Sequence, residues 1–231
     1  LIPDPRITFL FVGSVFLLYA FIFYFFGLKK NAEGNQEVEK FKLPQNNILI
    51  YGFLLMMNFA TLGIIIDWSP VWLTKDLGAP LFLGGLVIMF FNGGEIIARI
   101  SASKLINKFG EITIGCYFSI FSCALLFVSI LTMNLYVILF GIIIFGFGTA
   151  NFIAIVLRQA ISESNESISL TVSNLLTLGF GGFIFGPVIV GYLAEFMGLT
   201  FNMYLLSFIW AFNGIALYYL ISKNELSKST L

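Results

Sequence analysis

Four polar side chains follow one another at helical spacing inside a long apolar stretch: Asn92, Glu95, Arg99 and Ser103. At 100° per residue they fall within an arc of about 80° on one helix face. Glu95 and Arg99 are also spaced i, i+4, the favourable order for an ion pair. Each charge is costly alone in an apolar surrounding. Two interpretations stay open: a structural pair that seals the helix to a neighbour, or a cavity wall where Glu95 binds substrate or a proton.

Other polar residues in apolar stretches complete the set of candidate site residues. Asn58 and Asn92 fall close to the middle of their stretches, and Asn151 shares a helix face with Arg158. A buried amide needs a hydrogen-bond partner, which is either another helix or a bound solute. Asp67 lies nine positions beyond Asn58, on the opposite helix face. Asp67 and Arg158 are candidates for coupling or gating, although Arg158 also fits a side chain that extends to the membrane surface.

The elements that position these side chains are predicted from the composition of the chain. It is 59% hydrophobic and 10% charged, whereas soluble domains have about 25% charged residues. This excludes a soluble enzyme and a disordered chain. Basic and acidic residues balance at 12 each, so there is no basic excess for nucleic acid. Histidine is absent, which excludes an imidazole base and a His-rich metal site. There is also no Gly-rich phosphate loop and no Cys/His ligand set, and we expect no catalytic residues, no metal site and no cofactor.

Seven apolar runs are each long enough to cross a bilayer, whose core of about 30 Å takes roughly 20 helical residues. An apolar run of this length forms a helix in hydrocarbon, because every backbone polar group must be bonded internally. The expected fold is therefore an all-α membrane protein with seven transmembrane helices. The runs are 7–28, 47–67, 81–103, 112–131, 134–157, 168–194 and 200–222.

Orientation is predicted from Lys and Arg, which are enriched at cytoplasmic ends. One set of ends holds Lys29, Lys30, Lys40, Lys42, Arg99, Lys104, Lys108, Arg158, Lys223 and Lys228. The opposite ends hold only Arg6 and Lys75. This places the N-terminus outside and the C-terminus in the cytoplasm. Trp68 and Trp72 are then typical of the outer aromatic belt.

The run 168–194 is the richest in glycine and includes Gly182, Gly186, Pro187 and Gly191. Gly182 and Gly186 form a GxxxG pair, which allows close helix packing in membranes. Pro187 removes one backbone hydrogen bond. A hinge in a gating helix and a packing motif both explain this pattern.

Three stretches together resemble the major facilitator superfamily. Residues 182–195 resemble that family's eleventh span, with its Gly-Pro-x-x-x-Gly-x-x-Ala core. Residues 103–111 resemble the cytoplasmic loop between spans eight and nine, with Gly110 retained and Lys108 a conservative replacement. Residues 67–73 read Asp-Trp-Ser-x-x-Trp-Leu. They resemble the segment after the seventh span in a fucose-permease-like and drug-efflux-like subgroup.

The resemblance implies two six-helix halves, a central site and alternating access. On it, residues 1–28 are the last span of the N-terminal half, 29–46 the central cytoplasmic loop, 47–222 the C-terminal six-helix bundle and 223–231 a cytoplasmic tail. We therefore expect a secondary transporter of the cell (inner) membrane that moves a small solute, coupled to a proton or sodium ion. Glu95 is the best candidate for the protonatable group, because a low-dielectric cavity disfavours a charged carboxyl.

The start of the chain predicts that a further part of the protein lies upstream. Leu1 is not an initiator methionine, and an apolar run begins almost at once. We expect the rest of the N-terminal half to be supplied by the same protein, as the partner of this bundle. A complete seven-span protein is the alternative. Two other function classes also stay open: a seven-span receptor or sensor, and a membrane assembly factor that does not transport.

Overall fold

The computed structural model describes residues 5–27 and 46–229, which fall into two units divided between Lys40 and Phe41. The first unit is the helix α1 (Pro5–Ile22), which continues into a π-helical turn, η1 (Phe23–Gly27). Apart from residue 46, the predicted central loop lies outside the described residues. The two units are treated separately below.

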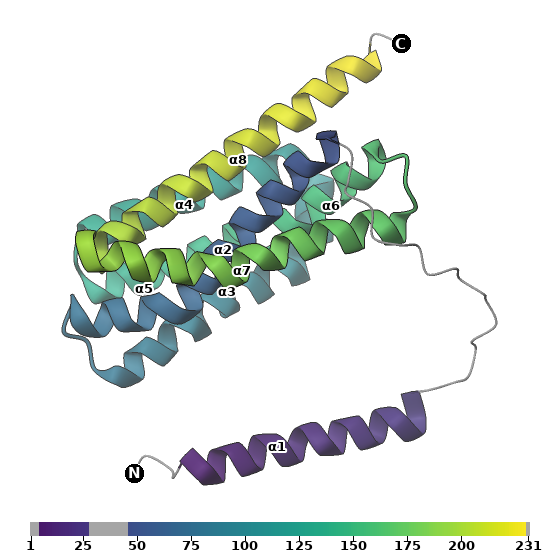
Figure 1. Cartoon of the computed structure of the whole chain (residues 1–231). Coiled ribbons are helices and arrows are strands. Elements are labelled where there is room, and N and C mark those ends of the chain that lie inside the picture. Colours follow the sequence, from purple (N-terminus) through teal and green to yellow (C-terminus); the bar gives the residue numbers. More distant parts are fainter. Residues whose placement is uncertain (1–4, 28–45, 230–231) are drawn as a thin grey trace. The chain divides into compact units, whose positions relative to one another are not determined.

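The second unit is a bundle of helices (Figure 1). Its elements are α2 (Asn46–Lys75), α3 (Leu81–Phe109), η2 (Thr113–Tyr117), α4 (Phe118–Leu131), α5 (Leu135–Thr149), α6 (Phe152–Glu163), α7 (Ile168–Met197) and α8 (Leu199–Ser229). The η2 turn runs into α4, and α5 with α6 makes one apolar span, so six spans here are long and apolar enough to cross a membrane. A shorter apolar helix covers Phe9–Phe25 in the first unit. The all-helical membrane fold is confirmed.

Local signals in the sequence end and start several of these helices. Gly110 and Gly198 follow α3 and α7 with φ values of 83° and 80°, a left-handed conformation that only glycine adopts without strain. Asn134 caps α5 by accepting a hydrogen bond from the backbone N–H of Tyr136 at 3.0 Å. These caps produce the short connections that keep consecutive spans antiparallel.

The α2 helix is longer than the apolar run that predicted it. It passes through Asp67 and Pro70 and ends at Lys75. Trp72 and Leu73 are almost fully buried, at 1% and 0% exposure, and this packing outweighs the single backbone bond that proline removes. The aromatic-belt prediction is wrong for Trp72, because its indole N–H lies inside the bundle and donates to Thr200 Oγ1 at 2.8 Å.

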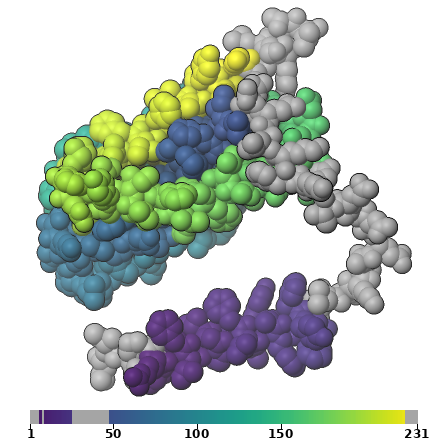
Figure 2. Space-filling view, viewed as in Figure 1, coloured from purple at the N-terminus to yellow at the C-terminus, as the bar shows by residue number. Residues whose placement is uncertain are grey.

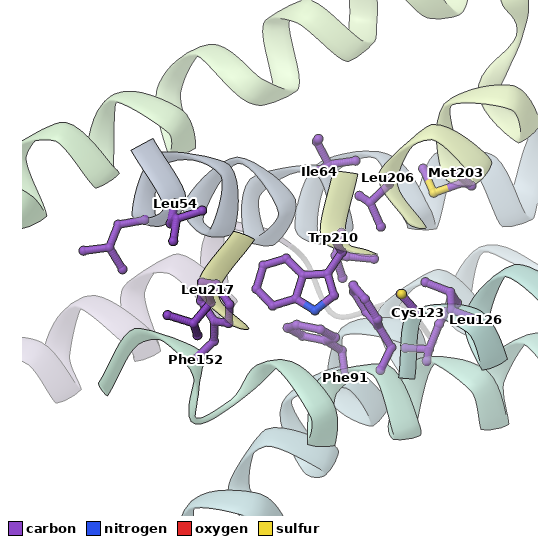
Figure 3. Close-up of a cluster of buried hydrophobic side chains, with 14 of the residues drawn as sticks. Leu54, Ile64, Phe91, Cys123, Leu126, Phe152, Met203, Leu206, Trp210 and Leu217 are labelled. Carbon is purple, nitrogen blue, oxygen red and sulfur yellow. The ribbon is translucent and has the colours of Figure 1, made fainter. Parts of the chain in front are cut away.

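The core of the bundle forms around α2, which packs against α3, α6, α7 and α8. Figure 2 shows side chains of the first part of α2, in blue, between those of α7 (green) and α8 (yellow). A second set of contacts joins α5 to α3 and α4. Large buried side chains, with Trp210 at their centre, fill the interior (Figure 3). The bundle thus has a closely packed, largely apolar interior in which each buried polar group stands out.

Candidate functional site

An ion pair lies at the middle of α3. Arg99 Nη1 and Nη2 donate to Glu95 Oε2 and Oε1 at 3.1 and 3.0 Å, so the pair is bidentate. Bidentate Arg–carboxylate pairs are among the stronger charge-assisted contacts. The Glu95 side chain is 9% exposed and the Arg99 side chain 50% exposed. Glu95 is central in the 29-residue helix, about 21 Å from either end at 1.5 Å per residue.

The side of α3 next to Glu95 is fixed by a close crossing with α5. A Cβ at Gly94 would lie 2.1 Å from Ile143 O, and a Cβ at Gly146 would lie 2.2 Å from Phe91 O. No larger residue fits at either position, so the two backbones come into direct contact. The crossing buries Glu95 at the edge of the bundle while the next part of the helix face stays open.

Together, Asn92, Glu95, Arg99 and Ser103 form the α3 strip. Asn92, Arg99 and Ser103 are exposed on the surface of the bundle, and Glu95 is buried at the margin of the strip. The exposed charge of the strip is therefore the guanidinium. This arrangement can bind a polar or charged group approaching α3 from outside the bundle.

Asn58 and Asn151 do not belong to this strip. Asn58 is 2% exposed on α2, and its Oδ1 has no hydrogen-bond partner among the described residues. Asn151 is 7% exposed and lies between α5 and α6. Across residues 46–229, no hydrogen bond joins Asn58, Asn92 or Asn151 to one another. That Asn58 and Asn151 contact a solute stays a prediction.

The span from Leu135 to Glu163 is interrupted at Ala150 and Asn151, which sequence reasoning missed. Asn151 has φ −94° and ψ −5°, and its side chain makes no capping bond. The signal was present, since Gly146, Gly148, Thr149 and Asn151 are all weak helix formers close together. Interrupted helices inside membranes occur where protein or water can satisfy the freed backbone groups. The interruption therefore leaves polar backbone groups without intrahelical partners inside the apolar bundle.

Charged residues gather at the end of the bundle where α6 finishes. Arg158 pairs with Glu111, and Gln159 Nε2 donates to the other oxygen of Glu111 at 3.3 Å. Tyr51, at the first turns of α2, donates to Glu163. Sequence reasoning singled out Arg158 but missed Glu111 and Glu163, because these partners are 47 and 112 residues from their contacts. These bonds hold α6 to α2 and to the start of η2.

Glycines of α7 form a close seam with α2. A Cβ at Gly182 would lie 1.9 Å from Met56 O, one at Gly186 2.7 Å from Ala60 Cβ, and one at Gly191 2.8 Å from the Trp68 ring. The helix α7 runs without interruption through Pro187. We call this contact the α2–α7 seam, and its geometry is that of packing.

Pro187 takes part in the same seam. Its carbonyl accepts a hydrogen bond from Trp68 Nε1 at 2.8 Å. Proline has no N–H for the carbonyl of Phe183, and this oxygen lies 3.1 Å from the position a Gly63 Cβ would take. The backbone of α2 therefore covers the point where α7 lacks a hydrogen bond. Asp67, in contrast, is exposed on α2 and forms no ion pair with another described residue.

At the opposite end of the bundle, the carboxylate of Asp76, just after α2, binds the first turn of α8. Asp76 Oδ2 accepts hydrogen bonds from Thr200 N at 3.1 Å and Thr200 Oγ1 at 2.6 Å. The first N–H groups of a helix have no partner within the helix, and a carboxylate there also interacts favourably with the helix dipole. Asp76 thus caps α8 from a distant part of the chain.

The bundle of apolar spans, with an ion pair at the middle of one of them, defines a multi-pass helical membrane protein. A family model for the Major Facilitator Superfamily matches residues 2–180. The chain belongs to this superfamily.

Curated relatives agree with this assignment. A Yersinia pestis protein described as an uncharacterized MFS-type transporter is 24% identical over 160 residues, which cover 69% of this chain and 42% of the relative. The membrane protein MosC of Rhizobium meliloti is 28% identical over 163 residues, or 68% of this chain and 39% of its own. A Sinorhizobium fredii protein described as an uncharacterized transporter is 21% identical over 153 residues, 66% and 41% of the two chains. The matched regions span about two fifths of these relatives.

Proposed function

We propose that this chain is part of a secondary active transporter that moves a small solute across a membrane by alternating access. Residues 47–222 form one of two bundles, 1–28 form the last span of the other half, 29–46 connect them and 223–231 form a tail. Supporting this, α1 is a unit separate from the bundle. The relatives described as transporters are also more than twice as long as the segment they share with this chain.

The α3 strip is the observation that carries the proposal. Charged side chains at the middle of a membrane span nearly always face other helices or water, because contact with lipid is costly. In the bundle, Asn92 and Arg99 are exposed at that depth. The strip therefore faces the other half of the transporter across a hydrated solute path, and Asn92, Glu95 and Arg99 contact the solute.

Coupling is assigned to the Glu95–Arg99 pair. Both Glu95 oxygens are held by Arg99. A solute group that binds the Arg99 guanidinium weakens its two hydrogen bonds to Glu95. The Glu95 carboxylate can then take up a proton. Sodium binding at the same carboxylate is the alternative mode. Asp67 and Arg158 keep a gating role in the proposal, with Arg158 acting through Glu111 at the end of α6.

Two finer assignments belong to the same proposal. The chain lies in the cell (inner) membrane with its N-terminus outside, because ten of its 12 Lys and Arg residues fall on one side of the spans. Residues 67–73 suggest a fucose-permease-like or drug-efflux-like subgroup.

The α2–α7 seam makes these two helices move as one body during the rocking of the bundles.

A thiol-accessibility experiment on the full-length protein in membranes tests the hydrated path. Asn92→Cys is exposed to a charged, membrane-impermeant thiol reagent, with Phe212→Cys as the matched control. Phe212 is 58% exposed on α8, outside the α3 strip, and we expect this exposed apolar side chain to face lipid. Within this chain, Cys116 and Cys123 are buried and should label slowly, and the protein without an added cysteine measures the background. We expect Asn92→Cys to react many times faster; equal protection of the two positions contradicts the proposal.

Transport itself is tested by finding a solute and measuring its movement. Solutes are screened for a rise in the unfolding temperature of the purified protein, since a ligand stabilises the state that it binds. Those that raise it are then tested for uptake into proteoliposomes. Binding without uptake or efflux identifies a receptor or an assembly factor instead of a transporter.

A further inference from the structure

Asn202 Oδ1, near the start of α8, is one buried polar atom without a hydrogen-bond partner among the described residues. Three others lie near the middle of α2 and α8. They are Oδ1 of Asn58, Oδ1 of Asn213 and Nε1 of Trp210. The three residues are 2%, 0% and 0% exposed. Native proteins leave few buried polar groups unpaired, because an unmade hydrogen bond in a low-dielectric interior is costly. Three such atoms on two facing helices call for a common explanation.

The three residues lie close to a single contact between α2 and α8. Asn213 Nδ2 donates to Leu54 O at 3.4 Å, which aligns α8 with α2. Thr200 contacts Asp76 at the far end, so the two helices are antiparallel. From the Leu54–Asn213 contact, Asn58 is about 6 Å along α2 and Trp210 about 4.5 Å along α8 in the same direction, at 1.5 Å per residue. Asn58 and Trp210 therefore each lie about one helical turn from this contact, toward the same end of the bundle.

Trp210 also adjoins the interruption between α5 and α6. The Trp210 ring contacts Phe145 of α5 at 6.0 Å and Phe152 of α6 at 4.9 Å between ring centroids. Figure 3 shows the Trp210 indole beside Phe91 and Phe152, with its nitrogen inside the cluster. Helix ends leave backbone groups without intrahelical partners. Polar groups from two further helix ends therefore lie close to Trp210.

The hydrogen-bonding capacity of the three atoms matches water. The indole N–H is a donor, and the two amide oxygens are acceptors. The Asn213 amide orientation is supported by its own bond, because Leu54 O requires the NH₂ group on that side. Water accepts and donates at once, and a buried water needs two to four polar partners.

We propose that the bundle binds internal water between α2, α8 and the α5–α6 interruption. The water accepts a hydrogen bond from Trp210 Nε1 and donates to Oδ1 of Asn58 and Oδ1 of Asn213. It belongs to the bundle, apart from the α3 strip, and is present whether or not a solute is bound. Asn58 then acts chiefly as a ligand of this water.

Radiolytic footprinting of the full-length protein in nanodiscs tests the proposal. X-ray pulses make hydroxyl radicals from water, and tandem mass spectrometry locates the oxidised residues. Radicals formed from a bound water modify the adjacent side chain even when it is buried. Met203 is the internal control, because it is 2% exposed on the same helix, lies in apolar surroundings and is readily oxidised. We expect Trp210 to be modified at least tenfold faster than Met203.

The variant Asn58→Leu identifies the ligands of the water. Removing one acceptor should lower the modification rate of Trp210 several-fold and lower the unfolding temperature. Modification of Trp210 no faster than Met203 in the unmodified protein overturns the proposal. Rapid modification that Asn58→Leu leaves unchanged, together with a raised unfolding temperature, removes Asn58 from the site and overturns the proposal in this form. Neither readout depends on transport, so failure here is distinct from failure of the proposed function.

Discussion

One added methyl group at Gly182 probes the α2–α7 seam directly. The Cβ of Gly182→Ala would lie 1.9 Å from Met56 O, and Cβ contacts below 3.0 Å essentially do not occur. The helices must therefore separate by at least about 1 Å, which forfeits a quarter to a half of the dispersion energy of the contacts along the seam. Overpacking of this kind costs about 1–3 kcal/mol. The better helix propensity of alanine offsets up to about 1 kcal/mol of it.

The neighbouring residue supplies a matched control. Gly181 lies on the same helix, but a Cβ there meets no atom within 4 Å. Gly181→Ala should therefore be neutral or more stable by up to about 1 kcal/mol. Near 200 residues, each 1 kcal/mol shifts the unfolding temperature by about 2–4 °C. Because the propensity gain is common to both, the two substitutions should differ by the overpacking cost, which corresponds to an unfolding temperature about 2–12 °C lower for Gly182→Ala than for Gly181→Ala.

Unfolding is followed with a thiol-reactive fluorophore in detergent. Cys116 and Cys123 are free and only 0% and 3% exposed, so they react when the bundle opens. The same unfolding temperature for Gly181→Ala and Gly182→Ala would refute the inference that the backbones of α2 and α7 touch at residue 182.

Three further changes test other contacts. Glu95→Gln should make solute transport insensitive to pH, and an unchanged pH profile would remove its proton-binding role. Thr200→Val removes the hydroxyl that donates to Asp76 and accepts from Trp72 Nε1, and leaves only the backbone bond to Asp76. Losing two hydrogen bonds of about 0.5–1.5 kcal/mol each should lower stability by about 1–3 kcal/mol, measured by thermal unfolding. A double-mutant cycle with Arg158→Ala and Glu111→Ala should give a coupling below about 1 kcal/mol, because the Arg158 side chain is 59% exposed. A coupling well above that value would mean that this ion pair is shielded from water.

Sequence alone predicted the features that depend on local spacing. Glu95 and Arg99 are one helical turn apart, so their positions on one face follow from the geometry of the helix. The spans follow from the length of the apolar runs, since hydrocarbon permits no other regular structure for them. The assignment of the glycine-rich run to one helix rests on the same argument.

Contacts between distant segments were beyond the reach of these patterns. The buried Trp72 donates its indole N–H to Thr200, 128 residues away. A tryptophan near a span end has the same sequence signature at a lipid surface. The capping of α8 by Asp76 and the pairing of Glu111 with Arg158 likewise depend on the tertiary fold and have no local sequence signal. The α5–α6 interruption left only a weak compositional signal, because glycine and threonine also occur in uninterrupted membrane helices.

The α2–α7 seam has a consequence for biosynthesis. The bond between Trp68 and Pro187 joins residues 119 positions apart, and Gly52 and Gly63 of α2 also contact α7. During translation, α2 enters the bilayer well before α7 is made. Until α7 is inserted, the glycine-containing face of α2 is in contact with lipid or with other helices. Newly made chains that stall at this stage present an unfinished helix face, where mispairing or capture by quality-control proteases would begin.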